Sequence, residues 1–258
     1  AMQGWSALIP SKIKADYINQ LIKCDFDCID VGSFVSPKVI PQMADTSEVI
    51  KMLHNQSGVT KLMAIAGNLQ GGTMALENDK ISIVGFPYAV SEVFLKQNLN
   101  TNTEKAHKTI LDLHSLAIKH NKSLRVYVSM AFGNPYNEPW SYKIVKETID
   151  FLVENGIDDI VYSDTTNEAT AEKINHLCSQ TIRQFPHLKL GLHLHTQGAD
   201  TFEKLDAAFQ SGIVYYESAV GGHGGCPRQR LPGRGKAGDP RHRRLQGRRD
   251  IRGRLEGP

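Results

Sequence analysis

The sequence predicts an α/β fold, and its simplest form is a (β/α)8, or TIM, barrel that lacks its first strand. Short, β-branched apolar runs alternate along the chain with longer segments of helical periodicity. This alternation indicates parallel strands joined by crossover helices. The 258 residues are a usual length for one such barrel. The predicted strands are 28–33, 61–66, 81–86, 124–131, 159–163, 190–195 and 214–219.

Helical segments precede and separate these strands. Pro10 and Ser11 open the first, in which Ile13, Tyr17 and Leu21 have the spacing of one helical face. A second is expected to begin at 45–46. The remaining helices are predicted at 102–120, 139–155, 168–184 and 200–211.

The strand count bears on how the sheet closes. Seven strands follow an initial helix, whereas a closed barrel has eight strands, each followed by a helix. We therefore expect the missing strand to lie just before residue 1. A doubly wound open sheet is the alternative, although no glycine-rich dinucleotide turn follows an early strand.

Composition divides the chain into residues 1–227 and 228–258. The last 31 residues contain ten Arg, one Lys, two Asp and one Glu, a charge of +8, which leaves 3 − 8 = −5 for the rest. They lack aromatic residues and apolar periodicity. We interpret this tail as disordered or as a shifted reading frame. A basic tail that binds nucleic acid is the alternative, but no motif or interleaved aromatic residue supports it.

The bulk properties favour a protein that is not embedded in a membrane. No apolar run approaches the roughly 18 residues that a membrane span needs. The first residues lack the basic and apolar regions of a signal peptide, and the four cysteines have neither zinc-type nor disulfide-framework spacing. These features predict a cytoplasmic location or an organelle matrix.

His193 and His195 are the first candidate functional residues. They stand two residues apart in a predicted strand, so both imidazoles project from the same face. Catalytic groups of a barrel lie at the carboxyl ends of its strands, where this pair falls. Two imidazoles on one face can bind a divalent metal. A hydrogen-bonded pair that only lines the barrel is the alternative.

Cys226 lies in a loop with four glycines among residues 221–225, directly after the last predicted strand. Glycine is entropically costly in an ordered loop, so such a loop favours movement over a ligand. A thiol on it can transfer a proton or act as a nucleophile. A surface loop with an incidental cysteine is the alternative.

Other polar residues also fall near strand ends. Asp30 and Ser33 end the first predicted strand, and a carboxylate that faces a barrel interior is expensive unless it is paired or used. Asp164 follows the fifth strand in the same way. Arg125 begins the fourth and would bind an anionic substrate group or form a salt bridge. Asn68 is predicted to be a turn residue or a helix cap.

Three of these segments resemble one family. The run from Asp30 to Lys38, Asp-Val-Gly-Ser-Phe-Val-Ser-Pro-Lys, resembles a signature of the hydroxymethylglutaryl-CoA lyases. The His193-Leu-His195 pair and the Gly-Gly-Cys226-Pro loop resemble two more. Isopropylmalate and homocitrate synthases share only the histidine pair. The resemblance covers residues 1–227.

The resemblance implies a (β/α)8 barrel that pairs as a homodimer and cleaves an acyl-CoA substrate with Mg²⁺ or Mn²⁺. Its reaction is retro-Claisen cleavage of 3-hydroxy-3-methylglutaryl-CoA to acetyl-CoA and acetoacetate. His193 and His195 would be metal ligands and Cys226 the catalytic thiol. Asp30 stands where many relatives have Glu. The predicted substrate-binding residues are Ser33, Arg125 and Asp164.

Two departures from the family pattern limit what this chain is expected to do. The Arg-Asp pair that ends the family's first strand would precede residue 1, and no Asn follows residue 227. Two of the four expected metal ligands are therefore missing. Another acyl-CoA lyase, a Claisen-type synthase and an inactive fragment remain the alternatives.

Overall fold

The computed structural model describes residues 2–5, 7–55, 58–196 and 200–220. Seven parallel strands form one sheet in the order β1-β2-β3-β4-β5-β6-β7. Each strand pairs with the next along the chain, whereas a doubly wound sheet would reverse its order at a switch point. The strands are β1 (Cys28–Ser33), β2 (Lys61–Ile65), β3 (Ile83–Ala89), β4 (Ser123–Ser129), β5 (Asp159–Asp164), β6 (Lys189–Leu194) and β7 (Tyr215–Glu217).

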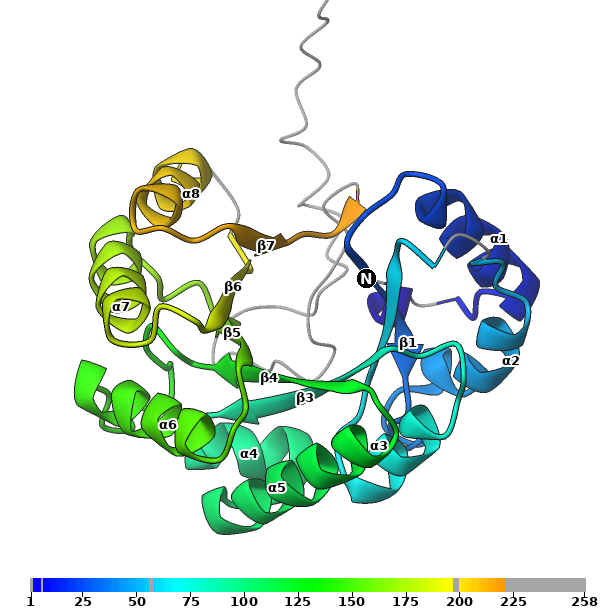
Figure 1. Ribbon diagram of the computed structural model, residues 1–258, viewed down its shortest axis with the longest axis horizontal. Helices are drawn as coiled ribbons and strands as arrows, with labels where there is room; N and C mark the ends of the chain where they lie inside the picture. Colours follow the sequence, from blue (N-terminus) through cyan, green and yellow to red (C-terminus); the bar gives the residue numbers. More distant parts are fainter. Residues whose placement is uncertain (1, 6, 56–57, 197–199, 221–258) are drawn as a thin grey trace, which may run out of the picture. The chain divides into compact units, whose positions relative to one another are not determined.

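The sheet curls, and its helices lie around the outside (Figure 1). Its edge strands are β1 and β7, which do not pair with each other in the described sheet. The architecture is that of a (β/α)8 barrel lacking one strand, which confirms the sequence prediction. None of the helices in the described ranges is long and apolar enough to cross a membrane. Backbone contacts group residues 1–228 into one compact unit.

Helices connect successive strands. All predicted helices are present, and two shorter ones that the sequence analysis did not identify follow β2 and β3. The first of these begins at Asn68, whose side chain accepts a hydrogen bond from the Gly71 N–H, so the predicted cap is confirmed. The helices are α1 (Ser11–Ile22), α2 (Thr46–Lys51), α3 (Leu69–Leu76), α4 (Glu92–Leu99), α5 (Thr103–Lys119), α6 (Tyr142–Glu154), α7 (Ala171–Gln184) and α8 (Thr201–Gln210).

The first helix packs on the core mainly through residues other than the three whose spacing was noted, of which only Leu21 contacts the core. Ile13 and Tyr17 are 56% and 42% exposed, whereas Ala15, Ile18 and Ile22 are buried in the core. Both sets of residues have helical spacing, so periodicity alone did not distinguish the two faces.

The barrel has two apolar regions. The larger core packs the outer face of the strands against the helices. A small inner cluster comprises Met63, Ile83, Tyr127 and Val161. Two glycines make room beside it: a Cβ on Gly85 would lie 2.6 Å from Ile65 Cδ1 and 3.0 Å from Tyr127 Cε2, and one on Gly191 would lie 3.1 Å from Val161 Cγ2. The inner face therefore has room for the Tyr127 ring because Gly85 beside it lacks a side chain, and Gly191 makes room for Val161 in the same way.

Candidate active site

His193 and His195 lie at the carboxyl end of β6, as the strand prediction required. His193 is in register with Ser163 of β5 and Glu217 of β7, so all three side chains lie on one face of the sheet. His195 directly follows the strand, and its N–H donates to the Asp164 carbonyl. The two imidazoles meet through their Nε2 atoms, which are 3.0 Å apart.

The other nitrogen of each ring determines its tautomer. His195 Nδ1 lies 3.2 Å from the Thr165 carbonyl oxygen, which can only accept, so Nδ1 carries the hydrogen. His193 Nδ1 lies 3.0 Å from Glu217 Oε2. Burial, followed by the nearby His193, lowers the pKa of His195 to about 4. His195 Nε2 therefore presents a lone pair toward His193 at neutral pH.

Two facing imidazole nitrogens can be joined by a proton or by a metal ion. Nitrogens bound about 2.1 Å from one ion, at a right angle to each other, would lie about 3.0 Å apart. That matches the separation of His193 Nε2 and His195 Nε2. The pair thus fits two adjacent positions around a divalent cation. Within the described ranges, no group of three or more His, Cys, Asp and Glu side chains is arranged to hold one.

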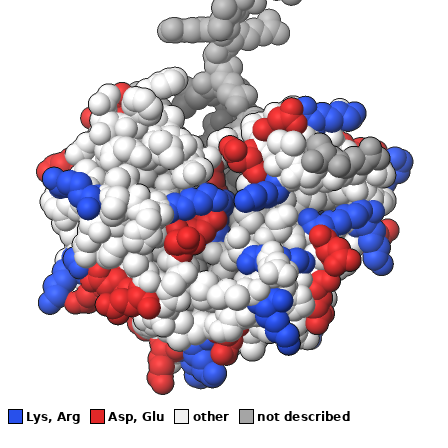
Figure 2. Space-filling view, viewed as in Figure 1, with Lys and Arg blue, Asp and Glu red and all other residues white. Residues whose placement is uncertain are grey.

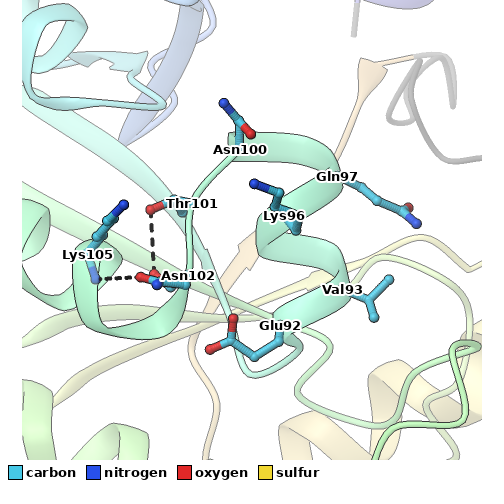
Figure 3. A pocket seen from close by; sticks show the side chains of 8 residues that line it. All are labelled: Glu92, Val93, Lys96, Gln97, Asn100, Thr101, Asn102 and Lys105. Atoms are coloured by element: carbon cyan, nitrogen blue, oxygen red, sulfur yellow. Dashed lines mark hydrogen bonds between the residues drawn. The ribbon is translucent and has the colours of Figure 1, made fainter.

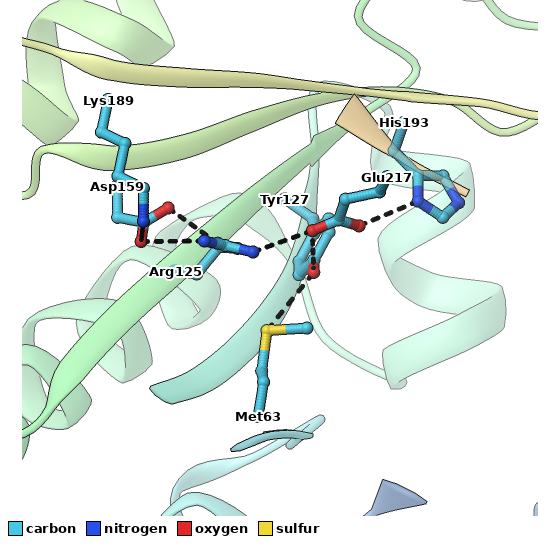
Figure 4. Close-up of polar contacts among 7 residues, drawn as sticks. All are labelled: Met63, Arg125, Tyr127, Asp159, Lys189, His193 and Glu217. Carbon is cyan, nitrogen blue, oxygen red and sulfur yellow. Dashed lines mark hydrogen bonds and ion pairs between the residues drawn. The ribbon is translucent and has the colours of Figure 1, made fainter. Parts of the chain in front are cut away.

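Glu217, which sequence reasoning missed, lies at the centre of a buried polar network (Figure 4). Its Oε1 accepts hydrogen bonds from Arg125 Nη1 at 3.0 Å and from the Tyr127 hydroxyl at 2.8 Å. Burial alone would raise the pKa of Glu217, but the hydrogen bond and charge of His193, together with Tyr127 and Arg125, lower it below its ordinary value. Glu217 is therefore an ionised acceptor, and His193 Nδ1 donates to it. The signal that could have identified Glu217 is a carboxylate within the predicted strand 214–219, where an unpaired charge would be costly.

Arg125 lies near the amino end of β4, whereas the residue of β4 that is level with His193 is Ser129, at the carboxyl end. Its Nε donates to Asp159 Oδ1 at 2.7 Å, and its Nη2 donates to Asp159 Oδ2 at 3.2 Å. Lys189 also bonds Asp159, at 3.0 Å. Because its guanidinium already contacts two carboxylates, the geometry favours the salt-bridge interpretation of Arg125 over substrate binding.

Asp30 and Ser33 lie on the same face of β1 because of a β-bulge. Residues three apart in a regular strand point to opposite faces. Here the register shifts between Asp30 and Gly32, so that Ser33 pairs with Ile65. The bulge requires glycine, since Gly32 has φ +152° and a Cβ there would lie 2.8 Å from Thr46 Oγ1.

These two residues differ in their surroundings. Asp30 accepts a hydrogen bond from the Gly32 N–H at 3.1 Å. Although the residue is solvent-exposed, loss of solvation by the protein around its carboxylate raises its pKa to about 6; the Gly32 hydrogen bond opposes this rise and the Glu217 charge adds a smaller increase. Ser33 is buried, and its hydroxyl has no hydrogen-bond partner among the described residues, as is also true of Ser163. Buried hydroxyls are normally satisfied, so these two are candidates for ligand contacts.

Through its carboxylate, Asp164 forms hydrogen bonds within the loop that follows β5. It is buried at the end of β5, where its carboxylate accepts hydrogen bonds from the N–H groups of Glu168 and Ala169. Burial raises its pKa. These contacts indicate that Asp164 shapes the loop after β5, and they do not support the predicted contact with substrate. Cys226 lies outside the described residues.

One cavity in the described part of the chain lies apart from the candidate residues. A cavity of about 410 Å³ lies between α4 and α5 (Figure 3), and none of the predicted site residues lines it. Acidic and basic side chains intermingle over the face seen in Figure 2, so no extended basic surface marks that face for nucleic acid. The lining residues of the cavity are Glu92, Val93, Lys96, Gln97, Asn100, Thr101, Asn102 and Lys105.

Comparison with known proteins identifies the family of the chain. The HMGL-like family model matches residues 3–238. The chain is 32% identical over 228 residues to the cytoplasmic 3-hydroxy-3-methylglutaryl-CoA lyase of Homo sapiens, and this match covers 88% of the chain and 60% of the relative. It is 30% identical to the hydroxymethylglutaryl-CoA lyase of Bacillus subtilis, over 88% of the chain and 75% of the relative. The chain therefore spans about 60% of the length of its human relative.

Solved structures give the same result. An HMG-CoA lyase from Acinetobacter baumannii, in complex with coenzyme A and 3-methylmalate, superposes with a TM-score of 0.82 at 26% identity, covering 90% of this chain and 74% of the other. The carboxyl transferase domain of Rhizobium etli pyruvate carboxylase, at 12% identity and a TM-score of 0.59, shares the fold alone. With the family model spanning nearly the whole chain and the histidine pair at the carboxyl ends of the strands, this protein belongs to the HMGL-like family.

Proposed function

We propose that the intact protein is a carbon–carbon lyase that cleaves 3-hydroxy-3-methylglutaryl-CoA to acetyl-CoA and acetoacetate with Mg²⁺ or Mn²⁺. The observation that carries this proposal is the His193–His195 pair, whose Nε2 atoms converge at 3.0 Å at the end of β6 in a chain of the HMGL-like family. Relatives named as HMG-CoA lyases, and the coenzyme A complex of one such lyase, support the choice of substrate.

The proposed roles follow from contacts and chemistry. His193 and His195 would hold the cation, which would polarise and orient the oxygens of the substrate. Asp30, with a pKa near 6, is suited to take a proton at neutral pH. Ser33 has a free buried hydroxyl for a substrate oxygen. Cys226 would return a proton to the enolate, a role that rests on the family resemblance.

Acetoacetate release from 3-hydroxy-3-methylglutaryl-CoA with Mn²⁺ tests the proposal. The chain as given is expected to turn over poorly, because the resemblance places two metal ligands outside it, whereas a parent protein that includes those flanking segments is expected to be active. His193→Ala in the active parent should abolish turnover. Full activity in that variant would refute the proposed metal site.

A longer-chain substrate is a second candidate. A Pseudomonas aeruginosa relative, 31% identical over 83% of this chain, is named as a lyase of both 3-hydroxy-3-isohexenylglutaryl-CoA and hydroxymethylglutaryl-CoA. Comparing kcat/KM for the two thioesters would distinguish them. A parent that prefers the isohexenyl substrate would reassign the physiological reaction.

Assembly and location complete the proposal. We propose a homodimer, in accord with the family resemblance, and light scattering of the purified parent would measure its mass directly. Relatives are named as cytoplasmic and as mitochondrial lyases, which supports a cytoplasmic or organelle-matrix location. Fluorescent tagging of the parent protein in its native cells would separate the two.

A further inference from the structure

Glu217 contacts the candidate metal ligand His193 on the side of its ring that faces away from His195. Its side chain is 23% exposed and lies on β7, the strand next to the histidine pair. Oε2 is 3.0 Å from His193 Nδ1, the ring nitrogen that faces away from His195. Oε1 is bound separately by Arg125 and Tyr127. The two oxygens thus have different partners, and only one of them faces the imidazole.

We infer that Glu217 is a positioning residue for metal binding, which fixes His193 as the tautomer that carries its hydrogen on Nδ1 and presents the Nε2 lone pair to the cation. This inference rests on the proposed metal-dependent function. A metal-bound histidine usually donates its remaining N–H to a carboxylate or carbonyl, and loss of that acceptor typically weakens metal binding. Thr165 already supplies such an acceptor to His195 through its carbonyl oxygen. Glu217 supplies the corresponding acceptor to His193.

The network also holds Glu217 itself in place. Arg125, which donates to Glu217 Oε1, is fixed by its two hydrogen bonds to Asp159. Tyr127, the second donor, packs its ring in the inner cluster of the barrel. Two donors from β4 therefore prevent the carboxylate from rotating away from His193. By this route, Arg125 acts on the metal site through Glu217 and without touching the substrate.

Glu217→Gln tests this inference because the amide cannot satisfy all three partners. Arg125 and Tyr127 donate to the same oxygen, so the amide oxygen is expected to stay with them. The amide NH₂ then faces His193 Nδ1, which must accept. The hydrogen of His193 moves to Nε2, where it blocks the metal. Asp45→Asn is the matched control, because Asp45 is 24% exposed and pairs with Lys14, away from the histidines.

Two measurements decide the outcome. Long-range ¹H–¹⁵N NMR of histidine is carried out on the metal-free chain above pH 8. His193 is expected to carry its hydrogen on Nδ1 in the unsubstituted chain and in Asp45→Asn, because the charged Glu217 carboxylate is a stronger acceptor than the neutral His195 Nε2, but on Nε2 in Glu217→Gln. Electron paramagnetic resonance of Mn²⁺ is expected to show affinity about 10- to 100-fold lower in Glu217→Gln. Glu217→Asp, which keeps the carboxylate, should recover part of the affinity.

The two measurements fail separately. If the unsubstituted chain already has its His193 hydrogen on Nε2, the inference is overturned without any variant. If Glu217→Gln keeps both the His193 tautomer and the Mn²⁺ affinity of the unsubstituted chain, the inference is likewise overturned. If neither this chain nor the longer parent protein binds Mn²⁺, the proposed metal-dependent function fails, while the tautomer measurement still decides the role of Glu217.

Discussion

Asp159→Asn is expected to destabilise the fold strongly, because it removes one charge from a buried ion pair. The Asp159 and Arg125 side chains are each 8% exposed, and two hydrogen bonds of 2.7 and 3.2 Å join them. Two unit charges about 4 Å apart, at an effective dielectric constant near 20, attract by about 4 kcal/mol. Removing one partner of a buried pair typically costs about 3–5 kcal/mol. Here Glu217 still contacts Arg125 while Lys189 also loses its partner, which places the expected loss near the lower end. We expect a loss in that range.

Urea denaturation followed by circular dichroism measures this loss. The control is Asp16→Asn, which breaks the surface pair with Lys12, whose side chains are 55% and 79% exposed; it should change the free energy of unfolding by less than about 1 kcal/mol. A loss below 1 kcal/mol in Asp159→Asn would show that the pair is solvated, and would refute the reasoning.

Further expectations concern the bulge and the effect of pH. Gly32→Ala should destabilise by more than about 2 kcal/mol, because it combines a strained backbone with a clash at Thr46, whereas Gly58→Ala, at φ +65° with open space, should cost about 1 kcal/mol in urea denaturation; equal costs would contradict the account of the bulge. In metal-free protein, the His195 pKa of about 4 lies below its ordinary 6.5, so the unfolded state binds more protons and stability should fall as pH decreases from 6.5 to 4. Asp30, with a pKa raised from 3.8 to about 6, acts with the opposite sign, so Asp30→Asn should steepen that fall; an unchanged pH profile would contradict the raised pKa.

Local sequence patterns were sufficient to predict the fold. Strands buried on both faces appear as apolar runs, and their alternation with helices leaves few possible topologies. The α3 and α4 helices were missed because each spans only eight residues, about two turns, which is too short for a clear periodic signal. The spacing of Ile13 and Tyr17 indicated a helix but not its buried face, because apolar residues also occur on surfaces.

The candidate site was only partly predictable. The spacing of His193 and His195 within one strand was enough to place both imidazoles together. The partners of Arg125 were not predictable, because they come from residues 34 and 92 positions away in sequence. Glu217 was missed for the same reason, since its importance depends on which strand lies beside it. Interactions between distant strands determine which polar residues are paired and which remain free.

Gly85 has a consequence for how the sequence can change. A side chain at this position of β3 would first meet Ile65 Cδ1 and then press on the ring of Tyr127, whose hydroxyl donates to Glu217, the acceptor of His193. Variation at residue 85 is therefore expected to be coupled to residues 65 and 127. A larger residue at 85 should coincide with a smaller one at 127, and with a different acceptor for the histidine. In directed evolution of this barrel, a substitution on β3 would thus be corrected by mutations on β4 and β7.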